Sequence, residues 1–330
     1  MYISASIPNG RVPTYPYVTQ LNKCLAMMWY VVKQVQKHLH SLWLLTKDDT
    51  PTFIIPNTIF GISGALAGSQ LITHTSDLTS ILNQLPRVLI FNWTNLLIFD
   101  LANQRLPSSI TEDTINKPWR PIPSNRVTST QLRHSLLLAI PPILAFNHFI
   151  LHTGPESALL YILTWMYNDL DGGNEGHIVR NVLIACAFAC YNAGSLKVAA
   201  VAAAAADSPS AEITTRGYVW IAIISGVILT TMQVQDLKDV AGDQARGRRS
   251  APLVLGDRAA RWSIAVPIPL WTAYCAYFWG LGWVGAVVPV VLGVYTAMRC
   301  VGIGGREEDR RTWEVWCLWT AVLYLMPLVR

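Results

Sequence analysis

Long apolar runs separated by short polar breaks recur from residue 52 to the end of the 330-residue chain, and they constrain its fold more than any other feature. Most are near the ~20 residues that an α-helix needs to cross ~30 Å of hydrocarbon, where every backbone polar group must be satisfied internally. The sequence therefore predicts an all-α polytopic membrane protein with nine transmembrane helices, at residues 52–74, 82–102, 132–152, 155–168 (the shortest), 178–206, 216–236, 259–279, 281–300 and 312–329.

The composition supports a chain embedded in membrane lipid. Hydrophobic residues make up 52% and charged residues 14% of the sequence, whereas soluble domains carry about 25% charged residues. The net charge of +5 is not concentrated in one tail, so it indicates cationic cytoplasmic loops and not a nucleic-acid interface. The six cysteines have no zinc-ligand spacing. We expect no nucleic acid and no obligate protein partner.

Two parts of different character make up the chain. Residues 1–50 are predicted to form an N-terminal arm that includes an interfacial amphipathic helix over Tyr30–Leu45, where Lys, Gln and His alternate with Val and Leu. A simple soluble arm is the alternative. Residues 51–330 are predicted to form the intramembrane domain that carries the nine helices.

Lysine and arginine follow the even-numbered predicted helices. Segments on the opposite side, such as "HTSD" and "TGPE", lack them almost entirely, so the positive-inside rule places the cationic loops and the N-terminus in the cytosol. The cytosolic cations would be Arg105, Lys117, Arg120, Arg126, Arg133, Arg180, Lys238, Arg246, Arg248, Arg249, Arg258, Arg306, Arg310 and Arg311.

Acidic and amide side chains gather at two of these cytosolic ends. Asp100, Asn103 and Gln104 end the second helix on one face, and Glu112 and Asp113 follow shortly after. A second set, spaced by three and four residues, ends the sixth helix: Asp236, Asp239 and Asp243. A solvated, ion-paired loop would explain one such set. Two sets of oxygen ligands on one side, without histidine or cysteine, favour Mg²⁺.

The stretch "INKPWRPIPSNRVT", Ile115–Thr128, follows the first acidic set. Its prolines restrict the backbone and would hold Lys117 and Arg120 over the mouth of the bundle. With Lys238, these cations are suited to an anionic substrate. The pattern predicts a diphosphate cradle whose substrate has an apolar tail inside the bundle.

At this point the sequence resembles the UbiA superfamily of intramembrane prenyltransferases. "EDTINKPWRPIPSNRVT" is similar to the family's IDAINxPxRPIPSG region, and "QDLKDVAGDQARGRRSAPLVLGDRAARW" is similar to its second aspartate motif. The resemblance covers residues 50 to 330. It implies a UbiA-like bundle with cytosolic cap loops and bound Mg²⁺, whose ligands would be Asp100, Asn103, Asp113, Asp236, Asp239 and Asp243.

Two departures from the family pattern indicate which branch of the superfamily the chain resembles. The compact first motif NDxxDxxxD is split here, because "LANQRLPSSITE" separates Asp100 from Asp113. The lysine loop YxxPPxKLK of aromatic prenyltransferases is replaced by "YNDLDGGNEGHIVRN", which begins at Tyr167. The result resembles the fungal UbiA-type membrane terpene cyclases. A tight Asp-Gly turn before the next helix is the structural alternative for this loop.

The resemblance implies a Mg²⁺-dependent terpene cyclase that ionises a prenyl diphosphate and releases diphosphate at an endoplasmic reticulum membrane. Farnesyl diphosphate and a sesquiterpene are the expected substrate and product, with geranylgeranyl diphosphate second. The expected catalytic residues are Asp100, Asp113, Asp236 and Asp243. The expected substrate-binding residues are Asn103, Lys117, Arg120, Tyr167, Asn168, Asp169 and Lys238.

Three other functions compete with a cyclase. A prenyltransferase acting on an aromatic acceptor would share the chemistry up to the cation. A transporter would place its acids near the membrane midplane, and a membrane scaffold would not need paired acidic motifs. For the cyclase, aromatic faces are expected to stabilise the cation. The candidates, as a class, are Trp93, Trp165, Tyr167, Tyr191, Trp220 and Trp316; polar candidates are Asn92, Asn95, Asn192, Gln233 and Gln235.

Overall fold

A computed structural model of the protein describes residues 16–73, 76–200 and 212–329, with side chains from residue 25 onward. The chain divides into two compact units, Met1–Trp43 and Leu44–Arg330. The expected arm before residue 16 and the alanine-rich end of the expected helix 178–206, after residue 200, lie outside the described residues.

The first unit is represented by helix α1, Pro16–Thr46, whose last residues belong to the second unit. The helix is longer than the Tyr30–Leu45 segment expected from the sequence. Large apolar side chains, among them Met27, Trp29 and Val32, are exposed on it. A place at the membrane interface remains a prediction for this helix.

The regular structure of the second unit is helical in its described residues, apart from an isolated bridge between Ile72 and Ile213. Its helices of 12 or more residues are α2 (Ile55–Leu66), α4 (Leu85–Gln104), α6 (Ser129–Phe149), α7 (Gly154–Asn168), α9 (His177–Ala200), α10 (Thr215–Thr231), α11 (Val234–Arg246), α14 (Pro267–Trp279), α15 (Trp283–Gly302) and α16 (Arg306–Leu325). Shorter elements are the π-helix η1 (Thr50–Ile54), η2 (Gly68–Gln70), α3 (Leu78–Leu82), α5 (Pro107–Asn116), α8 (Gly172–Glu175), α12 (Ala251–Leu255), α13 (Asp257–Ala265) and η4 (Met326–Leu328).

Within the described residues, each expected helix overlaps a helix in the structure. The expected helix 216–236 is broken, because α10 ends at Thr231 and α11 continues at an angle of 45°. By length and composition, α9 and α15 could each cross a membrane, and the α10–α11 pair could be a third, broken span. Within the described residues this falls short of nine spans, so the nine-span topology remains a prediction.

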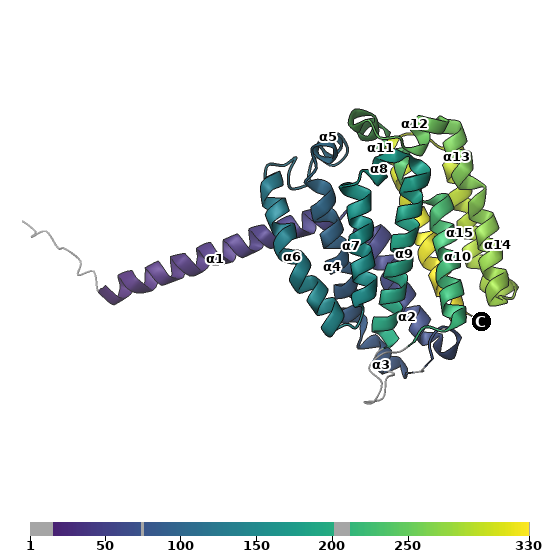
Figure 1. The fold of residues 1–330 in the computed structure, drawn as a ribbon, viewed down its shortest axis with the longest axis horizontal. Coiled ribbons are helices and arrows are strands. Elements are labelled where there is room, and N and C mark those ends of the chain that lie inside the picture. The colour runs from purple at the N-terminus through teal and green to yellow at the C-terminus, as the bar shows by residue number, and fades with distance from the viewer. Residues whose placement is uncertain (1–15, 74–75, 201–211, 330) are drawn as a thin grey trace, which may run out of the picture. The chain divides into compact units, whose positions relative to one another are not determined.

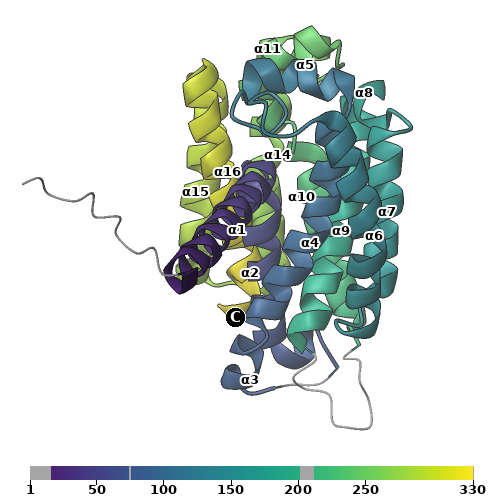
Figure 2. The same ribbon diagram turned by 90° about the vertical axis from the view of Figure 1, so that its left-hand side faces the viewer.

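The short helices that matter for the site gather at one end of the bundle, and α3 lies at the other end (Figures 1 and 2). There α5 packs against α11, and α11 packs against α16. The acidic helices α5 and α11, which are far apart in the sequence, are thereby brought together.

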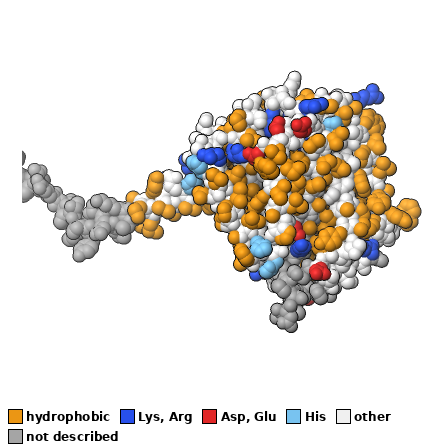
Figure 3. Space-filling model, viewed as in Figure 1, with side chains coloured by type: hydrophobic (Ala, Val, Ile, Leu, Met, Phe, Trp, Pro, Cys, Tyr) orange, Lys and Arg blue, Asp and Glu red, His pale blue; other side chains and the backbone are white. Residues whose placement is uncertain are grey.

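Small residues allow the central helices to approach closely. A Cβ at Gly61 on α2 would lie 2.6 Å from the carbonyl oxygen of Ser195 on α9, and one at Gly194 would lie 2.1 Å from the ring of Phe91. Such close approaches are common between membrane helices. Apolar side chains cover much of the face of the bundle that Figure 3 shows. The exposed apolar side chains of the second unit include Leu270, Tyr277, Trp283 and Val284. This surface suits contact with lipid.

Candidate functional site

A cavity of about 650 Å³ lies within the second unit. Its polar lining comes from the end of the bundle where α5 and α11 meet: Lys47, Asp48, Asp49, Asn103, Glu112, Asn116, Lys117, Arg120, Arg180, Gln235, Lys238, Asp239, Arg248, Arg306, Glu307, Arg310 and Glu314. Its apolar lining includes Phe53, Leu96, Phe99, Leu160, Leu163, Leu183, Ile184, Ala187 and Tyr191. One cavity therefore joins a charged region to an apolar one.

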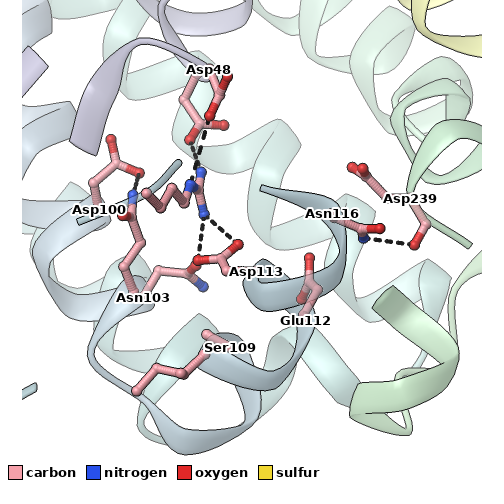
Figure 4. Close-up of polar contacts among 12 residues, drawn as sticks. Asp48, Asp100, Asn103, Ser109, Glu112, Asp113, Asn116 and Asp239 are labelled. Atoms are coloured by element: carbon pink, nitrogen blue, oxygen red, sulfur yellow. Dashed lines mark hydrogen bonds and ion pairs between the residues drawn. The ribbon is translucent and has the colours of Figure 1, made fainter. Parts of the chain in front are cut away.

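Arg120, in the proline-rich loop after α5, organises the first acidic set. Its Nη1 donates to both carboxylate oxygens of Asp113, at 3.0 and 3.1 Å, and its Nη2 donates to Oδ2 of Asp49 at 2.8 Å (Figure 4). Arg120 lines the cavity, whereas Asp113 is buried behind it. Arg120 therefore lies at the cavity, and its role in binding a substrate remains a prediction.

Asp100 and Asn103 come from the last turn of α4. Oδ1 of Asp100 accepts a hydrogen bond from Nε2 of Gln104 at 3.2 Å, while its Oδ2 is buried and has no donor among the described residues. Asn103 lines the cavity and donates through Nδ2 to Oδ1 of Asn168 at 2.8 Å. Asp100 itself is not part of the lining.

Asn116 joins the two acidic helices. Its Nδ2 donates to the carbonyl oxygen of Asp239 at 2.9 Å, and its Oδ1 accepts from the backbone N–H of Gly242 at 3.3 Å (Figure 4). Glu112 on α5 also accepts from Nη1 of Arg246 on α11 at 2.9 Å. These contacts fix α5 against α11 at the mouth of the cavity.

The three acids of the second set have different surroundings. Asp239 lines the cavity and pairs with Nζ of Lys238 at 2.6 Å. Asp243 is buried, with Oδ1 3.2 Å from Nη1 of Arg248 and with Oδ2 lacking a donor among the described residues. Asp236 is buried against Arg180.

Arg180 links the buried Asp236 to the wall of the cavity. Its Nε donates to the hydroxyl oxygen of Tyr167 at 3.1 Å, and both Arg180 and Tyr167 line the cavity. An acid of the second motif is thus connected to the apolar part of the cavity through two side chains.

The loop after α7 contributes less than the sequence suggests. Asn168 is buried but does not line the cavity, and Asp169 is exposed and pairs with Arg105. Asp171 has a φ of 62°, and Asn174 donates its side-chain and backbone N–H groups back to it. This stretch therefore forms a tight turn, the structural alternative given above.

The structure therefore divides the predicted site residues into two groups. Asn103, Lys117, Arg120, Tyr167, Lys238 and Asp239 line the cavity; Asp100, Asp113, Asn168, Asp169, Asp236 and Asp243 do not. Among residues 16–73, 76–200 and 212–329, no three His, Cys, Asp or Glu side chains form a ready metal cluster. The expected convergence of both acidic sets on shared ions is not preformed, because arginines hold Asp113, Asp236 and Asp243.

Several residues of the cavity were not identified from the sequence. Asp48 and Asp49 precede η1, and Arg180, Arg248 and Arg306 come from three later segments. For the two aspartates a signal was available, because an acidic pair directly precedes the first apolar run on the predicted cytosolic side. The arginines carry no such signal, since their partners are far apart in the sequence.

Four aromatic rings follow one another along the apolar part of the cavity. The ring centroids of Phe53 and Tyr191 are 5.6 Å apart, those of Phe53 and Phe99 are 6.5 Å apart, and those of Phe99 and Tyr167 are 5.3 Å apart. Of the aromatic candidates, Tyr167 and Tyr191 line the cavity.

The other aromatic and polar candidates have other surroundings. Trp220 packs against Phe278 and Trp279, Trp316 donates to Thr231, and Trp165 is exposed. Trp93 donates to Thr46. Of the polar candidates, Gln235 lines the cavity, whereas Asn92, Asn95, Asn192 and Gln233 do not.

The charges in the site support one another. Burial raises the pKa of Glu112, but Arg248, Lys117 and Arg246 more than offset it, so its pKa is lowered. Burial likewise raises the pKa of Asp49, and Lys117 and Arg120 reverse this effect. Burial lowers the pKa of Lys117, yet Asp239, Asp49 and Asp113 raise it above its usual value. Asp49, Glu112 and Lys117 are therefore charged at neutral pH.

The donor set fits Mg²⁺. The cavity presents carboxylates from Asp49, Glu112 and Asp239, and the buried Oδ2 atoms of Asp100 and Asp243 have no donor among the described residues. Oxygen ligands without sulfur or imidazole suit a hard cation that also binds substrate phosphates.

Two relatives span most of the chain. It is 27% identical over 299 residues to the fumagillin beta-trans-bergamotene synthase of Aspergillus fumigatus, covering 88% of this chain and 94% of the relative. It is 30% identical over 286 residues to a polyprenyl transferase of Hericium erinaceus, covering 86% and 92%. A synthase and a transferase are thus about equally similar.

The fold is also similar to that of a solved structure, a UbiA homologue from Archaeoglobus fulgidus bound to GPP and Mg²⁺. The TM-score is 0.55 at 10% identity, and the match covers 88% of this chain and all of that one (100%). A sequence profile of the UbiA prenyltransferase family matches residues 101–321, from the end of α4 into α16. The resemblance seen in the motifs is confirmed: the chain belongs to the UbiA prenyltransferase family.

Proposed function

We propose that this protein is a Mg²⁺-dependent intramembrane terpene cyclase that ionises a prenyl diphosphate, cyclises its tail and releases diphosphate. The observation that carries the proposal is the single cavity, charged at one end and lined by aromatic rings further in. The bergamotene synthase and the GPP- and Mg²⁺-bound UbiA homologue support it.

The diphosphate would bind at the charged end. Lys117 lines the cavity, and its ammonium group has no hydrogen bond or ion pair with any residue that the structure describes. Arg120 and Lys238 lie on the same lining, so three cations can meet the phosphate oxygens. Their positive charge would stabilise the negative charge that develops on the leaving diphosphate.

Mg²⁺ would be held by carboxylates of the two acidic sets, with Asp100, Asp239 and Asp243 supplying free or cavity-facing oxygens and Asn103 an amide oxygen. When bound, the ion would neutralise the leaving group. Asp113 and Asp236 are engaged by Arg120 and Arg180. We retain both as site residues, whose arginine partners must turn away before they can bind an ion.

The tail would lie among Phe53, Phe99, Tyr167 and Tyr191. Their faces can stabilise an allylic cation by about 2 kcal/mol or more each when water is excluded. We propose farnesyl diphosphate as the substrate and a sesquiterpene as the product, with geranylgeranyl diphosphate as the second choice. We also propose the endoplasmic reticulum membrane, with the charged end of the cavity facing the cytosol.

A prenyltransferase is the second candidate, because the polyprenyl transferase of Hericium erinaceus is 30% identical over 286 residues. The experiment that separates the two is gas chromatography of the headspace over membranes that contain the protein and farnesyl diphosphate. We expect a cyclic hydrocarbon that requires Mg²⁺ and no acceptor. Product formed only with an aromatic acceptor would contradict the cyclase, and a parallel assay with geranylgeranyl diphosphate tests chain length.

A further inference from the structure

We propose that Asp49, which lies outside both acidic motifs and before residues 101–321 of the family match, is an additional ligand of the divalent ion at the diphosphate end of the cavity. The inference rests on the proposed function and extends it to a segment that precedes the first membrane helix.

The segment before η1 is attached to the proline-rich loop by several contacts. Nε1 of Trp119 donates to Oδ2 of Asp48 at 2.8 Å, and Nζ of Lys47 lies 4.7 Å from the ring centroid of Trp119. Asp49 accepts from Arg120 at 2.8 Å. The segment continues into a π-helix, an uncommon conformation that is frequent at functional sites. These contacts place the Asp49 carboxylate at the cavity.

The same segment also lies beside Asp100 of the first motif. Nε2 of Gln104 donates both to Oδ1 of Asp100 and to the carbonyl oxygen of Leu45, which precedes Asp49 by four residues. Oδ2 of Asp100 is buried and has no donor in the described part of the chain. A buried carboxylate needs a counter-charge, and a divalent ion held by Asp49 and Asp100 would supply it and leave coordination positions for phosphate oxygens.

The position also accounts for the split first motif. In this chain "LANQRLPSSITE" separates Asp113 from Asp100 in the sequence, and Arg120 engages both oxygens of Asp113. Asp49 has one oxygen on Arg120 and lines the cavity. A carboxylate from before the first helix can therefore take the place that the insertion removed.

The test is Mn²⁺ binding, measured by electron paramagnetic resonance on the full chain in detergent with inorganic pyrophosphate. Asp49→Asn keeps an oxygen that can accept from Arg120 but removes the charge. We expect Mn²⁺ affinity to fall by at least the roughly 10- to 100-fold that loss of an outer-shell partner costs. Circular dichroism and melting curves check that the variant is folded. Asp77→Asn, which keeps the cap of α3, is the distant control.

Two further variants make the result decisive. Asp48→Asn removes a neighbouring charge without removing the proposed ligand, and an equal loss in that variant would overturn the role of Asp49. If Asp100→Asn and Asp239→Asn weaken Mn²⁺ binding and Asp49→Asn does not, this inference fails while the proposed function stands. If the unmodified protein does not bind Mn²⁺ with pyrophosphate, the proposed function itself fails.

Discussion

At the scale of single residues, many acids of the site are matched with cations. Arg120, Arg180 and Arg248 each contact a carboxylate that would otherwise be buried without a counter-charge. Lys117 faces the cavity without such a contact among the described residues. An ammonium group in this position is well placed to bind an anionic substrate.

Replacing Lys117 by methionine tests this assignment. A hydrogen bond to a charged group contributes about 1.5–3 kcal/mol, so we expect KM for the prenyl diphosphate to rise by about 10- to 100-fold. Lys117→Arg should recover part of the loss. The control is Arg126→Met, because Arg126 is exposed in the same loop and does not line the cavity. Equal KM values for Lys117→Met and Arg126→Met would remove Lys117 from the diphosphate site.

Arg180 and Asp236 form a buried pair whose members depend on each other. Arg180→Gln leaves Asp236 charged and buried, which costs about 3–5 kcal/mol for a broken buried pair. The double variant Arg180→Gln, Asp236→Asn should regain much of this stability, since no buried charge is then left unpaired. Denaturation in detergent measures both. A double variant no more stable than Arg180→Gln would show that the two residues are not coupled.

At the scale of elements, more of the fold than of the site could be predicted from the sequence. Apolar runs predict the long helices directly, because residues that face lipid or the core are apolar. The break between Thr231 and Val234 has no glycine or proline to mark it, and the expected helix ran through it. Asp236, Asp239 and Asp243 all follow the break on the one helix α11, so the break turns them together relative to α10.

The contact between α5 and α11 has its own prediction. A Cβ at Gly242 would lie 2.2 Å from Nδ2 of Asn116, so Gly242→Ala displaces the side chain that bridges the two helices. Overpacking of this kind costs about 1–3 kcal/mol, and we expect a lower melting temperature together with weaker substrate binding. Gly302→Ala is the matched control, because no atom lies within 4 Å of its added Cβ. Unchanged melting and KM in Gly242→Ala would mean that the contact does not shape the site.

At the scale of the whole molecule, the site joins residues from several separate segments at one end of the second unit. Sequence motifs identified the end of α4 with Asn103, the proline-rich loop and α11, since these resemble a known family pattern. Asp49, Arg180, Arg248 and Arg306 come from other segments and meet these only in three dimensions. Their roles depend on which helices are neighbours, and helix neighbours cannot be read from apolar runs.

The same arrangement predicts how the protein responds to loss of metal. Arginines already neutralise Asp113, Asp236 and Asp243 in the folded chain, so a chelator should abolish turnover without unfolding the protein. We expect the melting temperature in detergent with EDTA to match that of untreated protein, and activity to return with Mg²⁺. Adding Mg²⁺ and pyrophosphate together should raise the melting temperature, because a ligand at 100 times its Kd stabilises by about 2.7 kcal/mol. Unfolding by EDTA alone would instead show that the acids need the ion to fold, and that the arginine pairs are too weak to hold the empty site together.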